Sequence, residues 1–321
     1  MNNKFKILSY LFFIFFIKAQ GFCEPCEVNF SFTPEIGFLN GTIVENVWYV
    51  NTSYSDTTIT YTPTTRESRL DWQLENSFFF GAASDLTFNN KYAVSFSFKN
   101  AISGDSGIME DYDWLNTSNP DYLSRYSRHT NYINTFTQID FYIKRLFYPG
   151  KNKFISIAPC LGFETQNISF SGIGGWRTYD TENWEKIPFE NKKVITYTQA
   201  FIAPFVSVIT DFNFLNYFET LINISAVYIH KLNCIDTHHV KYGGIVYNDR
   251  IEDAWKFNAE LGFFYKINNN NKLGFKGNIS FIPDAYGFTY SSTTATTPDY
   301  TSMGGLSRFL WCYSVAYEIK F

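Results

Sequence analysis

Hydrophobic and polar residues alternate along the C-terminal stretch with the period of two that a β-strand requires. From Phe309 to Phe321, one set of alternate positions reads Phe, Trp, Tyr, Val, Tyr, Ile and Phe, and the other reads Leu, Cys, Ser, Ala, Glu and Lys. Successive side chains of a strand point to opposite faces, so one face suits lipid and the other an aqueous interior. Segments 92–98 and 272–281 alternate in the same way. The pattern predicts membrane-spanning strands.

Short turns and longer polar segments separate these strands. The turns fall at 89–91, 148–153, 213–216 and 268–271. The longer polar segments fall near 42–67, 102–130, 171–194, 233–250 and 289–304. Short periplasmic turns at one end and long extracellular loops at the other are typical of outer-membrane barrels. Four turns and five loops join ten strands, so we predict an all-β fold, a single ten-stranded antiparallel transmembrane β-barrel.

Some strands are expected to continue beyond the membrane. Segment 131–147 exceeds the roughly 9–11 residues that a spanning strand needs. A soluble all-β sandwich is the alternative fold, but a sandwich does not need a lipid-facing side. The chain also ends on Phe321, and a terminal aromatic residue on an amphipathic last strand resembles the recognition signal of outer-membrane barrels.

Composition agrees with a membrane-spanning barrel. The chain has 35 Phe and 23 Tyr, yet its mean hydropathy is slightly negative at −0.17. Alternation of apolar and polar residues explains how a chain so rich in aromatic residues can have a negative mean hydropathy. The N-terminus has Lys4 and Lys6, an apolar run over 7–17, and then Ala19-Gln20-Gly21. That order predicts a signal peptide over 1–21, with an uncleaved anchor as the alternative, and leaves 22–321 as one barrel domain.

Charge and cysteine content argue against nucleic-acid binding and against redox catalysis. The formal net charge of −4 and the scattered lysines and arginines give no electrostatic case for nucleic acid. Cys160 and Cys312 fall inside predicted strands and Cys234 in a predicted loop, so no paired framework emerges. Cys23 and Cys26 form a CxxC, for which a local disulfide or inert thiols are preferred over redox catalysis because no βαβ context follows.

Two short motifs offer catalytic chemistry. Asp111 and Asp113 form a D-x-D pair in the second predicted outer loop, and Asp236 and His238 form a D-x-H pair in the fourth. In extended backbone both members of each pair point to one face. A carboxylate that orients a histidine makes it a competent general base, and two close carboxylates can hold a water. Such a water would attack a peptide carbonyl without a covalent intermediate. Each motif alone also fits a solvated acidic loop.

A family resemblance supports the catalytic interpretation. The stretches Arg69-Leu70-Asp71-Trp72, Met109-Glu110-Asp111-Tyr112-Asp113-Trp114, Ser118-Asn119-Pro120 and Ser127-Arg128-His129 resemble the omptins, outer-membrane endoproteases of Gram-negative bacteria. Leu39-Asn40-Gly41 through Glu45 looks like their first strand and loop, and Asp236-Thr237-His238 falls where their D-x-H dyad does. The resemblance covers the mature chain. It implies a ten-stranded barrel, Asp111 and Asp113 as the water-binding couple, Asp236 and His238 as the dyad, and a supporting role for Ser127.

The resemblance is weaker at the positions that set specificity. Omptins cleave beside basic residues through an acidic pocket, of which Glu45 matches one acid. The second pocket acid is Cys234 here, and an acid two residues before Ser127 is Arg125. We therefore expect a preference for basic residues that is less strict. At the family's lipopolysaccharide-binding positions the chain has Phe163, Thr165, Asn167, Ala200 and Glu252.

The prediction is a monomeric cell-surface endopeptidase in the outer membrane of a Gram-negative-type bacterium, with its active site facing the outside. Its partners would be peptide or protein substrates and outer-membrane lipid, and no cofactor or metal is expected. His129 and His230 are interpreted as hydrogen-bonded residues rather than metal ligands. The alternative is a catalytically weak barrel that acts as an adhesin or host-protein receptor. A porin ranks third, because side chains can fill a ten-stranded barrel.

Overall fold

The computed structural model describes residues 27–55, 58–149, 154–214, 217–240, 244–292 and 298–321. Its strands are β1 (Val28–Ser55), β2 (Thr58–Phe88), β3 (Tyr92–Ala101), β4 (Gly104–Asp113), β5 (Arg125–Arg145), β6 (Ile155–Tyr179), β7 (Ile187–Pro188), β8 (Lys193–Phe214), β9 (Phe218–His238), β10 (Ile245–Lys266), β11 (Asn271–Ser291) and β12 (Ser302–Lys320). A 3-10 turn, η1 (Asp180–Glu182), follows β6. Within these ranges no helix is long and apolar enough to cross a membrane. The predicted signal peptide and the Cys23–Cys26 pair lie outside the described residues.

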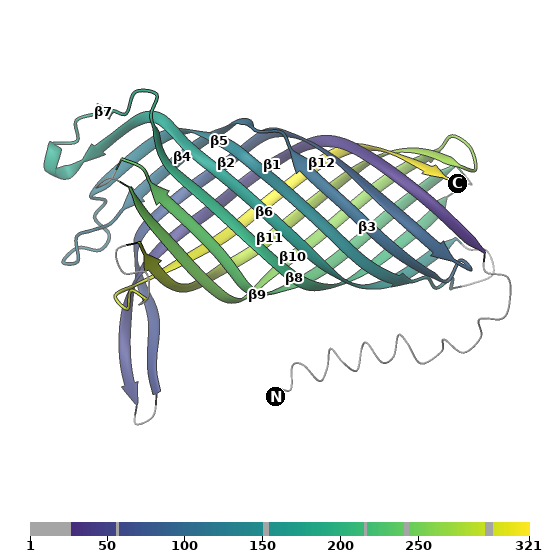
Figure 1. Cartoon of the computed structure of the whole chain (residues 1–321), viewed down its shortest axis with the longest axis horizontal. Coiled ribbons are helices and arrows are strands. Elements are labelled where there is room, and N and C mark those ends of the chain that lie inside the picture. Colours follow the sequence, from purple (N-terminus) through teal and green to yellow (C-terminus); the bar gives the residue numbers. More distant parts are fainter. Residues whose placement is uncertain (1–26, 56–57, 150–153, 215–216, 241–243, 293–297) are drawn as a thin grey trace.

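The strands form a closed antiparallel barrel (Figure 1). β3 and β4 follow one another in a single position between β2 and β5, and β7 is a two-residue addition to β6. The first strand pairs with the last, for example Phe38 with Tyr313, so the ring has no free edge in the membrane. Ten long strand positions therefore make the ring, and the predicted fold class is confirmed.

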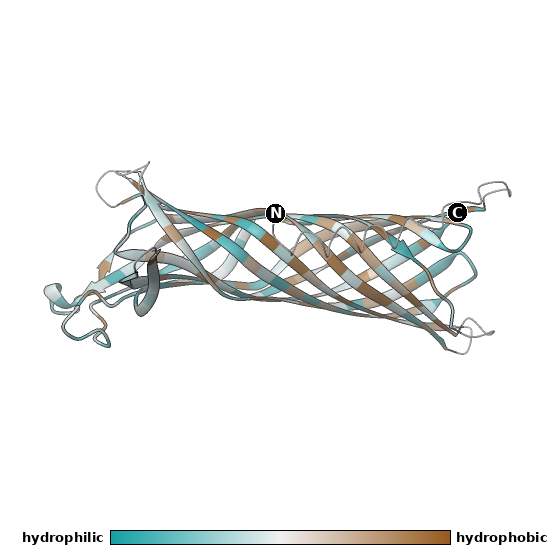
Figure 2. Cartoon of the chain, turned by 90° about the horizontal axis from the view of Figure 1, so that it is seen from below, coloured by the Kyte–Doolittle hydropathy of each residue, from teal (hydrophilic) through white to brown (hydrophobic). Residues whose placement is uncertain are grey.

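Alternation along the strands separates a lipid side from a lumen side. On β12, Phe309, Trp311 and Tyr313 are exposed on the outer surface, whereas the alternate residues Arg308 and Leu310 are buried. Hydrophobic residues concentrate on the half of the barrel that carries the short turns and the C-terminus, and the opposite end is mostly hydrophilic (Figure 2). That hydrophilic end is the outer end in the predicted orientation.

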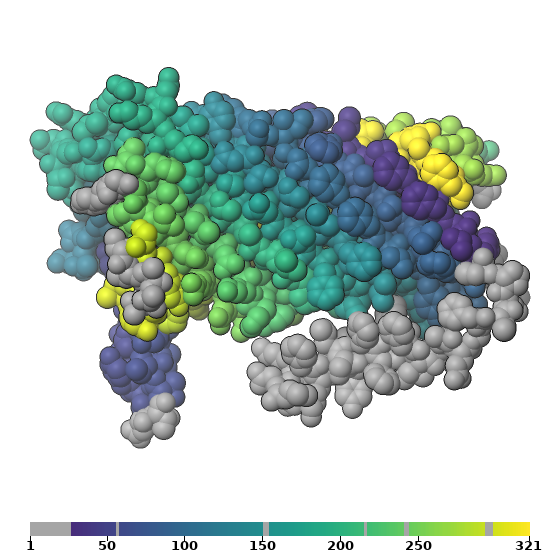
Figure 3. Space-filling view, in the orientation of Figure 1, coloured from purple at the N-terminus to yellow at the C-terminus, as the bar shows by residue number. Residues whose placement is uncertain are grey.

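The predicted long loops are largely strand, which corrects the loop boundaries. The predicted loop over 233–250 contains the ends of β9 and β10, so Cys234 lies on a strand and not in a loop. Above the membrane both faces of the wall meet water, so the apolar alternation disappears although the backbone ladder continues. β5 has 21 residues, more than the roughly 9–11 that a spanning strand needs, so its length agrees with the prediction that strands project beyond the membrane. The ends of β1 and β2 continue furthest, as a hairpin that protrudes from the outer end (Figures 1 and 3).

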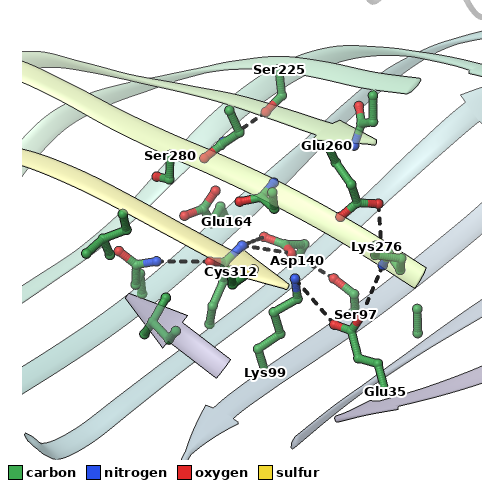
Figure 4. Close-up of a pocket in the computed structure, with 18 of the residues that line it drawn as sticks. Glu35, Ser97, Lys99, Asp140, Glu164, Ser225, Glu260, Lys276, Ser280 and Cys312 are labelled. Atoms are coloured by element: carbon green, nitrogen blue, oxygen red, sulfur yellow. Dashed lines mark hydrogen bonds and ion pairs between the residues drawn. The ribbon is translucent and has the colours of Figure 1, made fainter. Parts of the chain in front are cut away.

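The barrel interior has three layers between the two ends. Along β1 the buried inward residues run from Glu35 through Leu39 and Ile43 to Glu45. Glu35 belongs to a charged network around a cavity of about 140 Å³ in the lumen (Figure 4). Leu39 and Ile43 belong to an apolar layer in which Trp72 stacks on neighbouring aromatic rings. Glu45 lies beyond this layer, so a largely apolar floor separates the outer carboxylates from the lumen network. The buried Arg308 of β12 lies opposite Ile43 in this floor and donates to Gln166 of the lumen.

Candidate active site

Asp236 and His238 form a close pair at the outer end of β9. The His238 Nε2 atom lies 2.6 Å from the Asp236 Oδ2 atom, and the aspartate is buried while the histidine is partly exposed. The Tyr247 ring of β10 meets the imidazole edge to face, with centroids 5.6 Å apart. A carboxylate at this distance fixes the ring orientation and stabilises an imidazolium. The predicted contact between the two residues of the D-x-H motif is present.

Asp111 and Asp113 lie on β4, which is held between β2 and β5. The backbone of Asp111 is opposite Leu70 on one side and Ser127 on the other, and Asp113 lies two residues further out. Both side chains are partly buried. The ladder places Asp111 and Ser127 side by side, although they belong to separate motifs in the sequence.

Glu45 connects this wall to the Asp236–His238 wall. Burial raises the pKa of the Glu45 carboxyl well above its usual range, and the charges of Asp236, Asp249 and Asp111 raise that pKa further. Asp111 is on β4, Asp236 on β9 and Glu45 on β1, so carboxylates from opposite sides of the ring act on one another. The structure therefore brings both predicted motifs to one site at the barrel mouth.

Ser127 and His129 form a second buried pair on β5. The His129 Nδ1 atom lies 2.6 Å from the Gly174 carbonyl oxygen, and the Nε2 atom lies 2.8 Å from Ser127 Oγ. A carbonyl can only accept, so Nδ1 carries the proton and Nε2 accepts from the serine hydroxyl. Burial and the nearby His238 lower the pKa of His129, and the hydrogen bond to Gly174 only partly opposes this. The interpretation of His129 as a hydrogen-bonded residue is confirmed.

Sequence reasoning missed one buried acid at the site. Asp249 on β10 lies directly opposite Cys234 in the β9–β10 ladder, and both residues are buried. The Thr289 hydroxyl donates to Asp249 Oδ1 at 2.7 Å. Burial raises the pKa of Asp249 to about 7, and the charge of Asp236 adds to this increase while the Thr289 hydrogen bond opposes it. The sequence pattern that could have identified this acid is the spacing of Asp249 and Ile251, which places both side chains on the inward face of a strand. The pairing of Asp249 with Cys234 could not be predicted without the register of the two strands.

The five positions that correspond to a family lipid site lie on β6, β8 and β10. Phe163, Asn167 and Glu252 are exposed on the outer wall, and Thr165 and Ala200 are partly exposed. None of these five residues carries a positive charge. A phosphate-bearing lipid would therefore have no lysine or arginine to bind at these positions.

Three comparisons place the chain among known proteins. The model of the omptin family matches residues 27–308. "Protease 7" of Escherichia coli O157:H7 is 22% identical over 290 residues, which cover 85% of this chain and 86% of that protein. The "Plasminogen activator" of Yersinia pestis is 24% identical over 158 residues, about half of each chain (47% and 48%). The crystal structure of the outer-membrane protease OmpT of Escherichia coli superposes with a TM-score of 0.77 at 19% identity, and the match covers 91% of this chain and 97% of that one. The structural match shows a shared fold.

Proposed function

The chain belongs to the omptin family, and from that premise we propose that it is a cell-surface endopeptidase of the outer membrane. Residues 22–321 would form one monomeric domain after removal of 1–21. The contact between Asp236 and His238, beside the carboxylates of Glu45 and Asp111, is the observation that carries the proposal. Protease names among its relatives support the same reaction class.

The proposed reaction is direct attack by water on a peptide carbonyl. Asp111 and Asp113 hold the water, and His238 removes one of its protons while Asp236 stabilises the imidazolium. The hydroxide forms a bond to the carbonyl carbon and gives a tetrahedral intermediate. His238 then returns the proton to the amide nitrogen, the C–N bond breaks, and a carboxylic acid and an amine are released. Ser127 supports the site by hydrogen bonding and forms no acyl intermediate.

We further propose that the enzyme cleaves beside basic residues. Glu45 supplies a buried carboxylate at the mouth, and a buried carboxylate favours a cationic partner. The paired acid of the family pocket is replaced by Cys234, whose buried thiol carries no charge because burial raises its pKa well above the usual range.

The test compares the refolded parent with His238→Ala and Asp111→Ala on a peptide library. We expect the parent to cleave and both variants to lose at least about 10³-fold in kcat/KM. Asp284→Asn, an acid change on β11 away from the proposed catalytic groups, is the matched control and should keep parental cleavage. Equal cleavage by the parent and both alanine variants would remove the mechanism.

The second candidate is an adhesin or host-protein receptor with weak catalysis. The protruding hairpin of β1 and β2 favours it, because Tyr54 and Ile59 are exposed there at 77% and 52%. The five uncharged or acidic positions on the outer wall favour it too. A parent protein that cleaves no member of the library would favour this candidate.

A further inference from the structure

The Asp249 carboxylate lies over the neighbouring strands β11 and β12, on the side toward β1 and Glu45. Asp249 belongs to β10, yet its carboxylate contacts Thr289 of β11 and lies against Gly304 of β12. Gly304 is opposite Val47 of β1, two residues from Glu45 on the same strand. The Asp249 side chain therefore spans two strand positions, and its carboxylate ends beside the wall that carries Glu45.

Gly304 makes room for this carboxylate. A Cβ atom at position 304 would overlap the Asp249 carboxylate carbon and both of its oxygens. The backbone of Gly304 is ordinary strand, so its glycine is not needed for an unusual φ angle. The absence of a side chain at 304 instead allows the acid of β10 to approach β1.

Glu45 and Asp249 form a buried acidic pair that has a ligand-binding character. Glu45 is 3% exposed, and its Oε2 atom has no hydrogen-bond partner among the described residues. The charges that act on Glu45 come from Asp236, Asp249 and Asp111. A buried carboxylate without a cation is costly, so the arrangement favours a site where a cation arrives with a ligand.

The apolar layer below the pair fits the stem of a basic side chain. Ile43, Trp72 and Met109 are fully buried in register with one another across β1, β2 and β4. Lysine and arginine combine a charged end with an apolar stem of three or four methylene groups. Carboxylates beside an apolar layer match both parts of such a side chain.

We propose that Asp249 is the specificity-determining acid of this chain, and that it pairs with Glu45 to bind a guanidinium or ammonium group of the substrate. Asp249 thereby replaces the acid absent at position 234. The two positions are directly opposite in an antiparallel ladder, and such residues have Cβ atoms about 4.5–5.5 Å apart on the same face. An acid moved from 234 to 249 stays within reach of the same cation. The proposal rests on the proposed function and makes its preference for basic residues strict.

The experiment uses two peptides that differ only in arginine or its neutral isostere citrulline at the cleaved residue. The parent should cleave the arginine peptide more efficiently, and Asp249→Asn should lower the ratio of the two kcat/KM values by about 10- to 100-fold. Adding Cys234→Asp to Asp249→Asn should raise the ratio again, by at least about tenfold over Asp249→Asn alone. Gly304→Ala should lower it without changing any charge. A parental ratio in Asp249→Asn overturns the proposal.

Asp253→Asn is the matched control, because Asp253 is an exposed acid on the same strand. Its positive φ of 59° is one that asparagine tolerates well, so the backbone should not change. It should keep the parental ratio, and an equal loss in this variant would also overturn the proposal by showing a general charge effect.

Binding separates this proposal from the proposed function. In a His238→Ala background, fluorescence anisotropy measures the affinity for each labelled peptide without cleavage. We expect tighter binding of the arginine peptide, lost on Asp249→Asn. If the parent cleaves nothing but this discrimination remains, the proposed hydrolysis fails and the pocket stands. If His238→Ala binds both peptides equally, the pocket assignment fails whatever the cleavage result.

Discussion

Lysines neutralise the buried acids Glu35 and Glu164 in the barrel lumen, whereas within the described part of the chain no lysine pairs with Glu45 or Asp249 at the barrel mouth. Glu35 lies 3.3 Å from the Lys99 ammonium and 3.1 Å from that of Lys276 (Figure 4). The charges acting on Glu45 at the mouth are instead those of other carboxylates. Glutamate therefore forms ion pairs that fill the barrel lumen at position 35, whereas at position 45 it is available to a ligand at the mouth.

The difference follows from the cost of burying charge. A buried ion pair largely offsets the desolvation of both partners, and removing one partner leaves an uncompensated charge. Acids without a cation respond by retaining a proton, which is why the pKa values of Glu45 and Asp249 are raised. An incoming cation can then release that proton and take its place.

The largest effect should follow a change at the mouth that keeps its shape. Asp236→Asn retains the side-chain volume but removes the charge that stabilises a His238 imidazolium. We expect kcat to fall by at least about 10³-fold, with unfolding in urea unchanged within about 1 kcal/mol because the surrounding packing is kept. Kinetics and denaturant titration of one preparation measure both. A large loss of stability with normal kcat would instead show that Asp236 has a structural role like that of the lumen acids.

A change in the lumen should lower stability and leave kcat unchanged. Glu35→Ala leaves Lys99 and Lys276 without their shared acid in a buried site. We expect the free energy of unfolding to fall by about 3–5 kcal/mol, while kcat of the folded protein is retained, because an apolar layer separates Glu35 from the mouth. Glu35→Gln, which keeps the volume, is the control for cavity formation. Parental stability in both variants would contradict the structural role.

The pH dependence of selectivity should sharpen the comparison further. Asp249 is neutral below its pKa of about 7 and charged above it, so the arginine-to-citrulline ratio should rise by up to about tenfold between roughly pH 6 and pH 8. The charge of Asp249 acts on Glu45 and on Cys234, and the charge of Asp236 acts on Asp249. Dividing the two rates cancels any effect of pH on the steps that both peptides share. A ratio that falls with pH, or one equally steep in Asp249→Asn, would disprove the assignment.

The smallest effect should come from Ser127→Ala. This change removes one hydroxyl that donates to His129, and such a hydrogen bond contributes about 1 kcal/mol. We expect kcat/KM to fall by no more than about tenfold, which is the equivalent rate effect. Trapping of a covalent acyl intermediate in the parent, or a loss beyond about 10³-fold in the variant, would instead identify Ser127 as a nucleophile.

Most of the fold could be read from the sequence, because alternation in residues such as Trp311 and Tyr313 reports the lipid boundary directly. The ends of β9 and β10 could not, because above the membrane polar residues occupy both faces. The D-x-H contact was predictable because its two residues are two positions apart on one strand. Asp249 was not, because its role depends on the exact register of β9 against β10, which places it opposite Cys234, and on the space at Gly304 of β12.

The pairing of β1 with β12 has a consequence for how the protein is made. Phe38 and Tyr313 are neighbours in the ladder although nearly the whole chain lies between them. No ring can close before the last strand exists, so loop-closure entropy must be overcome late and contact order is high. Until then, β1 and the growing end both present open strand edges that invite aggregation. Safe assembly of this barrel therefore depends on keeping the finished chain unpaired until its two ends can meet.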